Sequence, residues 1–149
     1  MLFRSAGHSR AWDKFRGGSL LDGGPLSLRE REIVIDRTAA RNACEYEWGV
    51  HVAIFAGPAG LTEAQVHATV LGKASDPCWS PAEQAMIAAV DALHERATLS
   101  EAEFKALSAH YDDDQVLEII LLCGFYRTVA YLTNALALPL ENNAARFPN

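Results

Sequence analysis

The apolar and polar positions of this chain follow the period of amphipathic helices. In one segment Met86, Val90, Leu93 and Ala97 are spaced i, i+4, i+7 and i+11, which predicts a single buried helical stripe. No segment shows a competing strand pattern. We therefore predict an all-α fold with helices over Arg10–Arg16, Leu28–Asn42, Ala43–Ala56, Glu63–Leu71, Pro81–Ala97, Glu101–His110 and Asp114–Leu136.

Several of these helix starts carry a capping box, in which a Ser or Thr and a Glu or Gln three residues later cap each other's backbone N–H groups. Such pairs are Ser27 with Glu30, Thr62 with Gln65, Ser80 with Glu83, and Ser100 with Glu103. Between the helices, residues 57–60 indicate a turn and residues 73–79 a loop, since each segment contains proline among turn-forming residues.

The last predicted helix is apolar on nearly every face, which places it at the centre of a bundle or across a subunit interface. Residues 116–138 are long enough to tempt a membrane assignment, but Glu118, Arg127 and Asn134 interrupt the run and would each be costly in hydrocarbon. We expect a buried core helix and no membrane partner. Because no signal peptide is recognisable near the N-terminus, we expect a cytoplasmic protein.

Composition narrows the class of protein further. The 149 residues are 50% apolar and 21% charged, which suits one globular domain over residues 1–149. The formal net charge is -6 and the basic residues are scattered, so nucleic acid is a poor candidate partner. An odd set of cysteines, Cys44, Cys78 and Cys123, makes a structural disulfide framework improbable.

Reactive residue types gather in one segment. Cys44, Glu47, Trp48 and His51 are spaced i, i+3, i+4 and i+7, so on a helix a thiol, a carboxylate and an imidazole share one face. This pattern indicates either a reactive trio or a packed face with a few polar members. For Cys44 the second interpretation is a small buried hydrophobe, and for His51 it is a core histidine satisfied by a carboxylate.

A second polar track crosses the apolar last helix, where Gly124, Arg127, Tyr131 and Asn134 are spaced i, i+3, i+7 and i+10. Arg127 could hold a substrate carboxylate through two parallel hydrogen bonds, or it could anchor a buried salt bridge. We predict a small-molecule site formed by Tyr46, Trp48, Arg127, Tyr131 and Asn134, with packing as the alternative role of Trp48.

The sequence resembles the carboxymuconolactone decarboxylase and AhpD-like superfamily from about Phe3 to Glu141. The resemblance rests on segments in matching order: Leu28-Arg29-Glu30-Arg31-Glu32, Tyr46-Glu47-Trp48 with His51, Gly57 to Leu61, Trp79-Ser80-Pro81-Ala82-Glu83, and Gly124-Phe125-Tyr126-Arg127. It implies an AhpD-like helical bundle, with a central hairpin of Leu28–Asn42 and Ala43–Ala56 against a long C-terminal helix. It also implies a homo-oligomer, as a dimer, trimer or hexamer.

Redox members of the superfamily carry Cys-x-x-Cys-x-x-x-His, with a glutamate twelve residues before the first cysteine as a proton relay. The resemblance places Glu32, Cys44 and His51 on those positions, whereas Glu47 replaces the second cysteine. A disulfide therefore cannot close within this helix. The remaining groups suit the proton transfer of the founding decarboxylases, with His51 and Glu47 as the proton-transfer pair, Glu32 as relay or orienter, and Cys44 as auxiliary acid or filler.

Three functional hypotheses stay open at this point. The first is a cofactor-independent acid–base enzyme acting on a small anionic or lactone-like metabolite. The second is a thiol peroxidase using Cys44, and the third is a non-catalytic oligomeric binding protein. Glu32, Cys44, Glu47 and His51 could also furnish metal ligands, but the paired motifs of di-iron bundles and zinc proteases do not occur, so we expect neither a metal nor an organic cofactor.

Overall fold

The computed structural model describes residues 15, 17–18, 20–21 and 23–149. Within this part of the chain, six α-helices and no strand confirm the predicted all-α fold. The predicted helix Arg10–Arg16 lies outside the described residues, apart from Phe15. The helices are α2 (Leu28–Arg41), α3 (Glu45–Phe55), α4 (Glu63–Leu71), α5 (Pro81–Arg96), α6 (Glu101–Ser108) and α7 (Asp113–Ala135).

The capping boxes position the helix starts as the sequence predicted. All four pairs form reciprocal hydrogen bonds at the beginnings of α2, α4, α5 and α6. A further box, Asp112 with Gln115, caps α7 and was not predicted. The prediction that Ala97 belongs to the buried apolar stripe was wrong. Ala97 follows the end of α5 in a left-handed conformation and is exposed.

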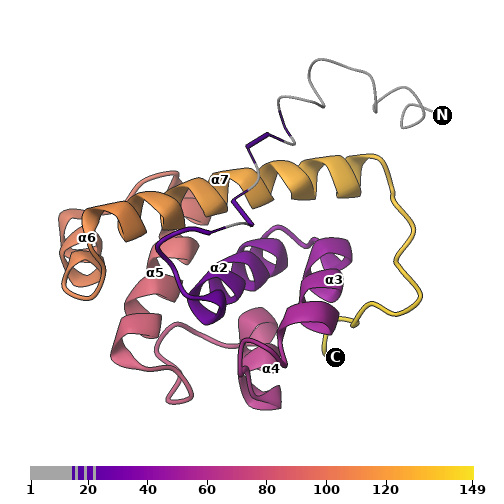
Figure 1. Ribbon diagram of the computed structural model, residues 1–149, viewed down its shortest axis with the longest axis horizontal. Helices are drawn as coiled ribbons and strands as arrows, with labels where there is room; N and C mark the ends of the chain where they lie inside the picture. The colour runs from indigo at the N-terminus through magenta and orange to yellow at the C-terminus, as the bar shows by residue number, and fades with distance from the viewer. Residues whose placement is uncertain (1–14, 16, 19, 22) are drawn as a thin grey trace.

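Helix α2 is the central element of the fold, and α3, α4, α5 and α7 all pack against it (Figure 1). Its residues 32–39 are buried without interruption, because neighbours cover the helix on every side. This stretch combines apolar Ile33, Val34 and Ile35 with charged residues that require partners in the interior.

Helix α7 runs along one side of α2 and confirms the predicted long C-terminal core helix (Figure 1). Ile119, Leu122, Tyr126 and Ala130 are buried along its inner face, whereas its outer face includes exposed leucines and Tyr131. By length and composition alone α7 could cross a membrane, but core helices of soluble proteins meet the same criteria.

The turn between α2 and α3 differs from the prediction of two nearly continuous helices. Ala43 has a left-handed backbone with φ of 51°, and Cys44 is the N-cap of α3, with φ of -95° and ψ of 78° outside the helical region. The thiol is therefore attached just outside the helix rather than within its first turn. The prediction that Cys44 lies on the helix was therefore wrong, since Cys44 precedes its first residue.

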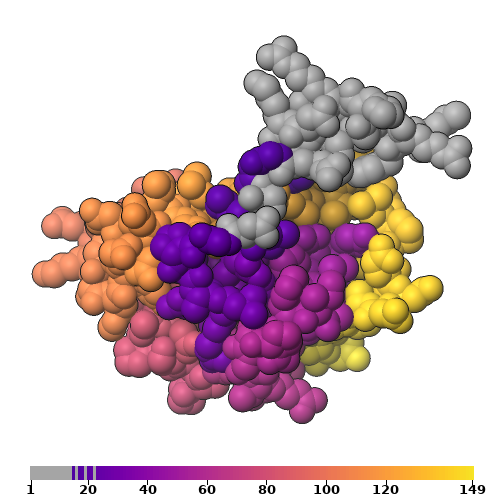
Figure 2. All heavy atoms as spheres, in the orientation of Figure 1, coloured from indigo at the N-terminus to yellow at the C-terminus, as the bar shows by residue number. Residues whose placement is uncertain are grey.

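The C-terminal segment covers one face of α3. The Ala145 N–H donates to the Gly49 carbonyl at 3.0 Å, and the Phe147 ring lies 5.1 Å from the Trp48 ring. A Cβ atom at position 49 would lie 2.3 Å from the Ala145 carbonyl oxygen, so glycine permits this close approach. Figure 2 shows the C-terminal residues packed directly against α3.

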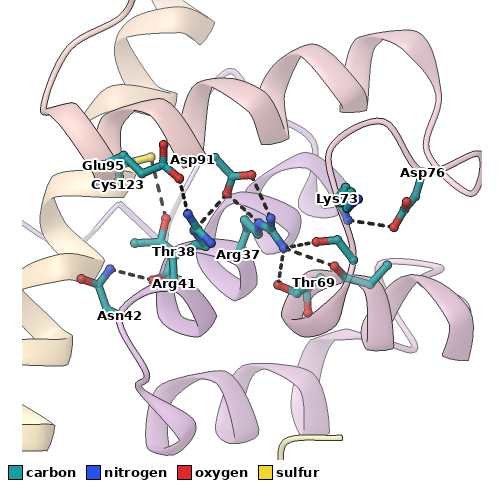
Figure 3. Close-up of polar contacts among 12 residues, drawn as sticks. Arg37, Thr38, Arg41, Asn42, Thr69, Lys73, Asp76, Asp91, Glu95 and Cys123 are labelled. Atoms are coloured by element: carbon teal, nitrogen blue, oxygen red, sulfur yellow. Dashed lines mark hydrogen bonds and ion pairs between the residues drawn. The ribbon is translucent and has the colours of Figure 1, made fainter.

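Arg37 joins three helices through a buried set of hydrogen bonds (Figure 3). Its Nε and Nη2 atoms donate to the two carboxylate oxygens of Asp91 on α5, each at 2.8 Å. Its Nη1 donates to the carbonyls of Thr69 at 3.1 Å and Gly72 at 3.0 Å, at the end of α4. The guanidinium thus satisfies orphan carbonyls of one helix and a carboxylate of another.

Replacing Arg37 with Leu should destabilise the protein by about 3–5 kcal/mol, because Asp91 and the α4 carbonyls would lose their buried donor. Urea unfolding measures the change. Arg96→Leu is the matched control, since Arg96 pairs with Glu103 at the surface and its loss should be barely detectable. Equal effects of the two substitutions would contradict this account of the core.

Candidate active site

Three predicted site residues meet where α2 and α3 cross. His51 Nδ1 donates to Glu32 Oε2 at 2.7 Å, and His51 Nε2 lies 3.2 Å from Glu47 Oε1. Glu47 and His51 face the same way because they are one turn apart on α3. The Glu32 side chain is fully buried, that of His51 is 5% exposed, and that of Glu47 is 18% exposed. The imidazole therefore bridges an inner and an outer carboxylate.

The two carboxylates control the protonation of His51. Burial alone would lower the pKa of the imidazole, but the hydrogen bonds to Glu32 and Glu47 outweigh it and raise the pKa to about 9. At neutral pH His51 is accordingly an imidazolium, and both ring nitrogens carry a proton that points at a carboxylate. This state suits a general acid.

Neighbouring side chains fix the imidazole and supply a cation. The rings of Phe55 and Tyr126 lie 5.4 and 5.3 Å from that of His51, the latter edge-on. Arg31 donates from Nε to Glu32 Oε1 at 3.1 Å, and its guanidinium lies over the Phe55 ring. Two cationic groups thus offset the two carboxylates of this cluster.

Asp36 belongs to the same region and was missed in the sequence. It follows Glu32 by one helical turn, is 1% exposed, and its Oδ1 has no hydrogen-bond partner among the described residues. Burial raises the pKa of Asp36 well above its usual range, although the nearby His51 charge opposes the shift. The environment of Asp36 therefore favours the protonated form of its carboxyl group. The available signal was an acid directly after the apolar run Ile33-Val34-Ile35.

The polar contact of Cys44 is with α7 and not with the carboxylates or the imidazole. Its Sγ is 3.0 Å from the Thr133 hydroxyl on α7, and the side chain is fully buried beside Trp48. The Trp48 indole donates to Thr69 Oγ1 at 2.9 Å, which ties α3 to α4. These contacts are structural in kind, and the reactive role of Cys44 stays a prediction.

The other predicted substrate residues do not join His51. Arg127 donates from Nε to the Tyr131 hydroxyl at 2.7 Å and from Nη1 to a carbonyl on α5. Asn134 donates to the Asn42 carbonyl at 3.0 Å, and the Tyr46 hydroxyl donates to Glu141. Helix α7 contacts His51 through Tyr126. Arg127 is the next residue on α7, so its side chain points about 100° away around the helix axis. The substrate-binding roles of these residues remain predictions.

The arrangement also bears on metal binding. No group of three or more His, Cys, Asp or Glu side chains within the described parts of the chain has the geometry to hold a metal ion. The Glu32, His51 and Glu47 side chains instead satisfy one another by hydrogen bonds, with Arg31 as the added cation.

Comparison with known families identifies the chain. Residues 6–92 match the model of the carboxymuconolactone decarboxylase family. This chain belongs to that family. The matched range includes Glu32, Glu47 and His51, so the residues that meet in the structure lie within the family domain. No curated protein sequence matches this carboxymuconolactone decarboxylase family member at a significant level.

Solved structures confirm the AhpD-like fold of this family member. A protein of unknown function from Agrobacterium tumefaciens, a suggested AhpD antioxidant defence protein, has a TM-score of 0.82 at 18% identity, over 93% of this chain and 95% of its own. Uncharacterized peroxidase-related proteins from Silicibacter sp. TM1040 and Ralstonia eutropha JMP134 both have a TM-score of 0.75. Their identities are 20% and 21%, over 89% of this chain and 69% and 70% of theirs.

The raised pKa of His51 predicts how the free energy of unfolding depends on pH, which tests whether His51 bridges Glu32 and Glu47. Because the folded pKa of about 9 exceeds the unfolded value of 6.5, the stabilisation is complete below pH 6.5 and is lost as pH rises through about 9. The difference corresponds to about 3 kcal/mol. Urea unfolding between pH 6 and 10 should show this loss in the wild type and not in His51→Gln.

His67→Gln is the matched control, since His67 lies exposed on α4. This variant should follow the wild-type profile. Parallel pH profiles for wild type and His51→Gln would contradict the bridge.

Proposed function

We propose that this protein is a cofactor-independent acid–base enzyme that acts on a small anionic or lactone-like metabolite, as a decarboxylase-like lyase. The observation that supports the proposal is the His51 imidazole held between a fully buried and a partly exposed carboxylate. Glu32 orients the ring from inside, and Glu47 links the outer ring nitrogen to the surface. Such a graded environment separates the orienting group from the proton-exchanging group.

The protonation state indicates how the cluster would work. In a decarboxylation the C–C bond to the carboxylate breaks, its electron pair passes into a conjugated carbonyl, CO₂ leaves, and the resulting enolate takes up a proton. An imidazolium with a pKa of about 9 can donate that proton at neutral pH. Glu47 then returns a proton from water to Nε2 of His51, because it is the more exposed of the two carboxylates.

A cation beside the acid would favour an anionic substrate. Arg31 contacts Glu32, and its side chain is 15% exposed, so its charge lies near the surface and close to the hydrogen-bonded set of Glu32, His51 and Glu47, called the relay below. An incoming carboxylate would meet both this guanidinium and the imidazolium. Arg31 is thus the cation in direct contact with the proposed machinery, whereas Arg127 lies elsewhere on α7.

The thiol peroxidase alternative has weaker support. Two structural neighbours are described as peroxidase-related, but at 20% and 21% identity they support the fold alone. Glu47 occupies the position of the second cysteine of the redox members, and Cys44 is fully buried against Thr133. A peroxidatic thiol needs access to peroxide, and the fully buried side chain of Cys44 lacks it.

Substitutions at Glu47 and His51 test the proposal. The substrates are a panel of carboxylated unsaturated lactones, and ¹H NMR in D₂O measures their decarboxylation and the incorporation of deuterium. Glu47→Gln and His51→Gln should each lower kcat by about 10²–10⁴, the usual contribution of a positioned proton donor. The wild-type rate should also fall as pH rises through about 9, where His51 loses its proton.

Glu45→Gln is the matched control, because Glu45 lies on the same helix and bonds the Phe147 N–H rather than His51. It should retain wild-type turnover. Full activity in Glu47→Gln and His51→Gln, on any substrate that the wild type converts, would refute the assignment.

Mild peroxide treatment tests the thiol alternative by mass spectrometry. Cys44 and Cys123 are buried and Cys78 is partly exposed, so Cys78 should oxidise first and Cys44 should stay reduced. Formation of a sulfenic acid on Cys44 ahead of Cys78 would instead favour peroxidase chemistry.

A further inference from the structure

A cavity lies between α2, α5 and α7, on a different face of α2 from Glu32. Its volume is about 230 Å³. Val90, Leu93 and Ile120 contribute to a largely apolar lining, and His94 and Arg127 contribute polar groups. His51 and Glu47 are not among its lining residues, so this cavity is separate from the proposed relay.

Arg127 has no carboxylate partner within the described residues, although it is only partly exposed. Its contacts are neutral: Nε donates to the Tyr131 hydroxyl, and Nη1 donates to the His94 carbonyl at 3.1 Å. Its Nη2 makes no hydrogen bond with the described part of the chain. A partly desolvated guanidinium is normally paired, so this one favours an anion from outside the chain.

His94 adds a second unsatisfied group to the same cavity. Its Nδ1 is buried and has no hydrogen-bond partner among the described side chains and backbone. Burial, followed by the charges of Arg41 and Arg127, lowers the pKa of His94, despite the opposing effect of Asp91 and Glu95. The imidazole is therefore neutral and can donate one hydrogen bond.

The nearby carboxylates do not neutralise Arg127. Asp91 binds Arg37 through both oxygens, and Glu95 binds Arg41 at 2.5 Å (Figure 3). Both acids are thus committed to arginines on α2. Among the described residues, no carboxylate therefore balances the positive charge of Arg127 beside this apolar cavity.

We propose that this cavity binds a small apolar monocarboxylate of about the size of benzoate, with its carboxylate at Arg127 and His94 and its apolar body against Val90, Leu93 and Ile120. The volume fits, since a dry cavity of about 150 Å³ holds benzene and the carboxylate needs additional room. Binding here is independent of the proposed acid–base chemistry, because the cavity contains neither His51 nor Glu47.

Calorimetric titration of the intact protein with benzoate tests this site, with benzamide and acetate as matched probes. Benzoate should bind at least tenfold more tightly than benzamide, which has the ring without the charge, and than acetate, which has the charge without the ring. Absence of benzoate binding, or equal affinity for benzoate and benzamide, would overturn the proposal.

Two substitutions locate the binding. Arg127→Gln should weaken benzoate at least tenfold. Gly124→Leu should block the cavity, and it should fold because a Cβ at position 124 meets nothing within 4 Å and leucine favours a helix over glycine. Circular dichroism checks the fold of both variants.

Arg96→Gln and His51→Gln serve as controls and should leave benzoate affinity unchanged. Arg96 lies at the surface in a pair with Glu103, so it tests for a general charge effect. Loss of binding in His51→Gln together with full binding in Arg127→Gln would place the ligand at the relay and overturn the proposal.

Discussion

The pairing of Glu32 with His51 is the interaction on which the site and its surroundings depend. A carboxylate with no exposed surface is costly in a protein interior unless it is hydrogen-bonded and paired. His51 on α3 and Arg31 on α2 provide the partners, and the 2.7 Å contact fixes how α3 lies across α2. The same contact supports the proposed acid–base chemistry, because it turns one ring nitrogen inward and leaves the other facing Glu47.

Helix α2 shows three ways of placing an ionisable group in a core. Glu32 is paired with the imidazole and Arg31, and Arg37 is paired with Asp91 and capped by backbone carbonyls. Asp36 has no cation in hydrogen-bond contact within the described part of the chain, and burial raises its pKa. Asp36 therefore places a carboxyl group with a raised pKa one turn from Glu32, in a position that packing alone would assign to an apolar residue.

Local signals in the sequence predicted most of the fold. Capping boxes depend on residues three apart, and the contact of Glu47 with His51 needs only one helical turn, so both could be recognised without tertiary information. The displacement of Cys44 could not be foreseen, because the left-handed residue before it is alanine rather than glycine. Arg127 illustrates the remaining limit, since helical spacing shows which residues share a face but not what lies opposite that face.

The family and the AhpD-like fold are shared with proteins of differing chemistry, and the chemistry proposed for this protein depends on the Glu47 carboxylate beside the imidazole. The most direct test is ¹⁵N NMR of the His51 ring in the wild-type protein across a pH titration. Both ring nitrogens should be protonated at pH 7 and should titrate together near a pKa of about 9. A neutral single tautomer at pH 7, with a pKa at or below 6.5, would contradict the account.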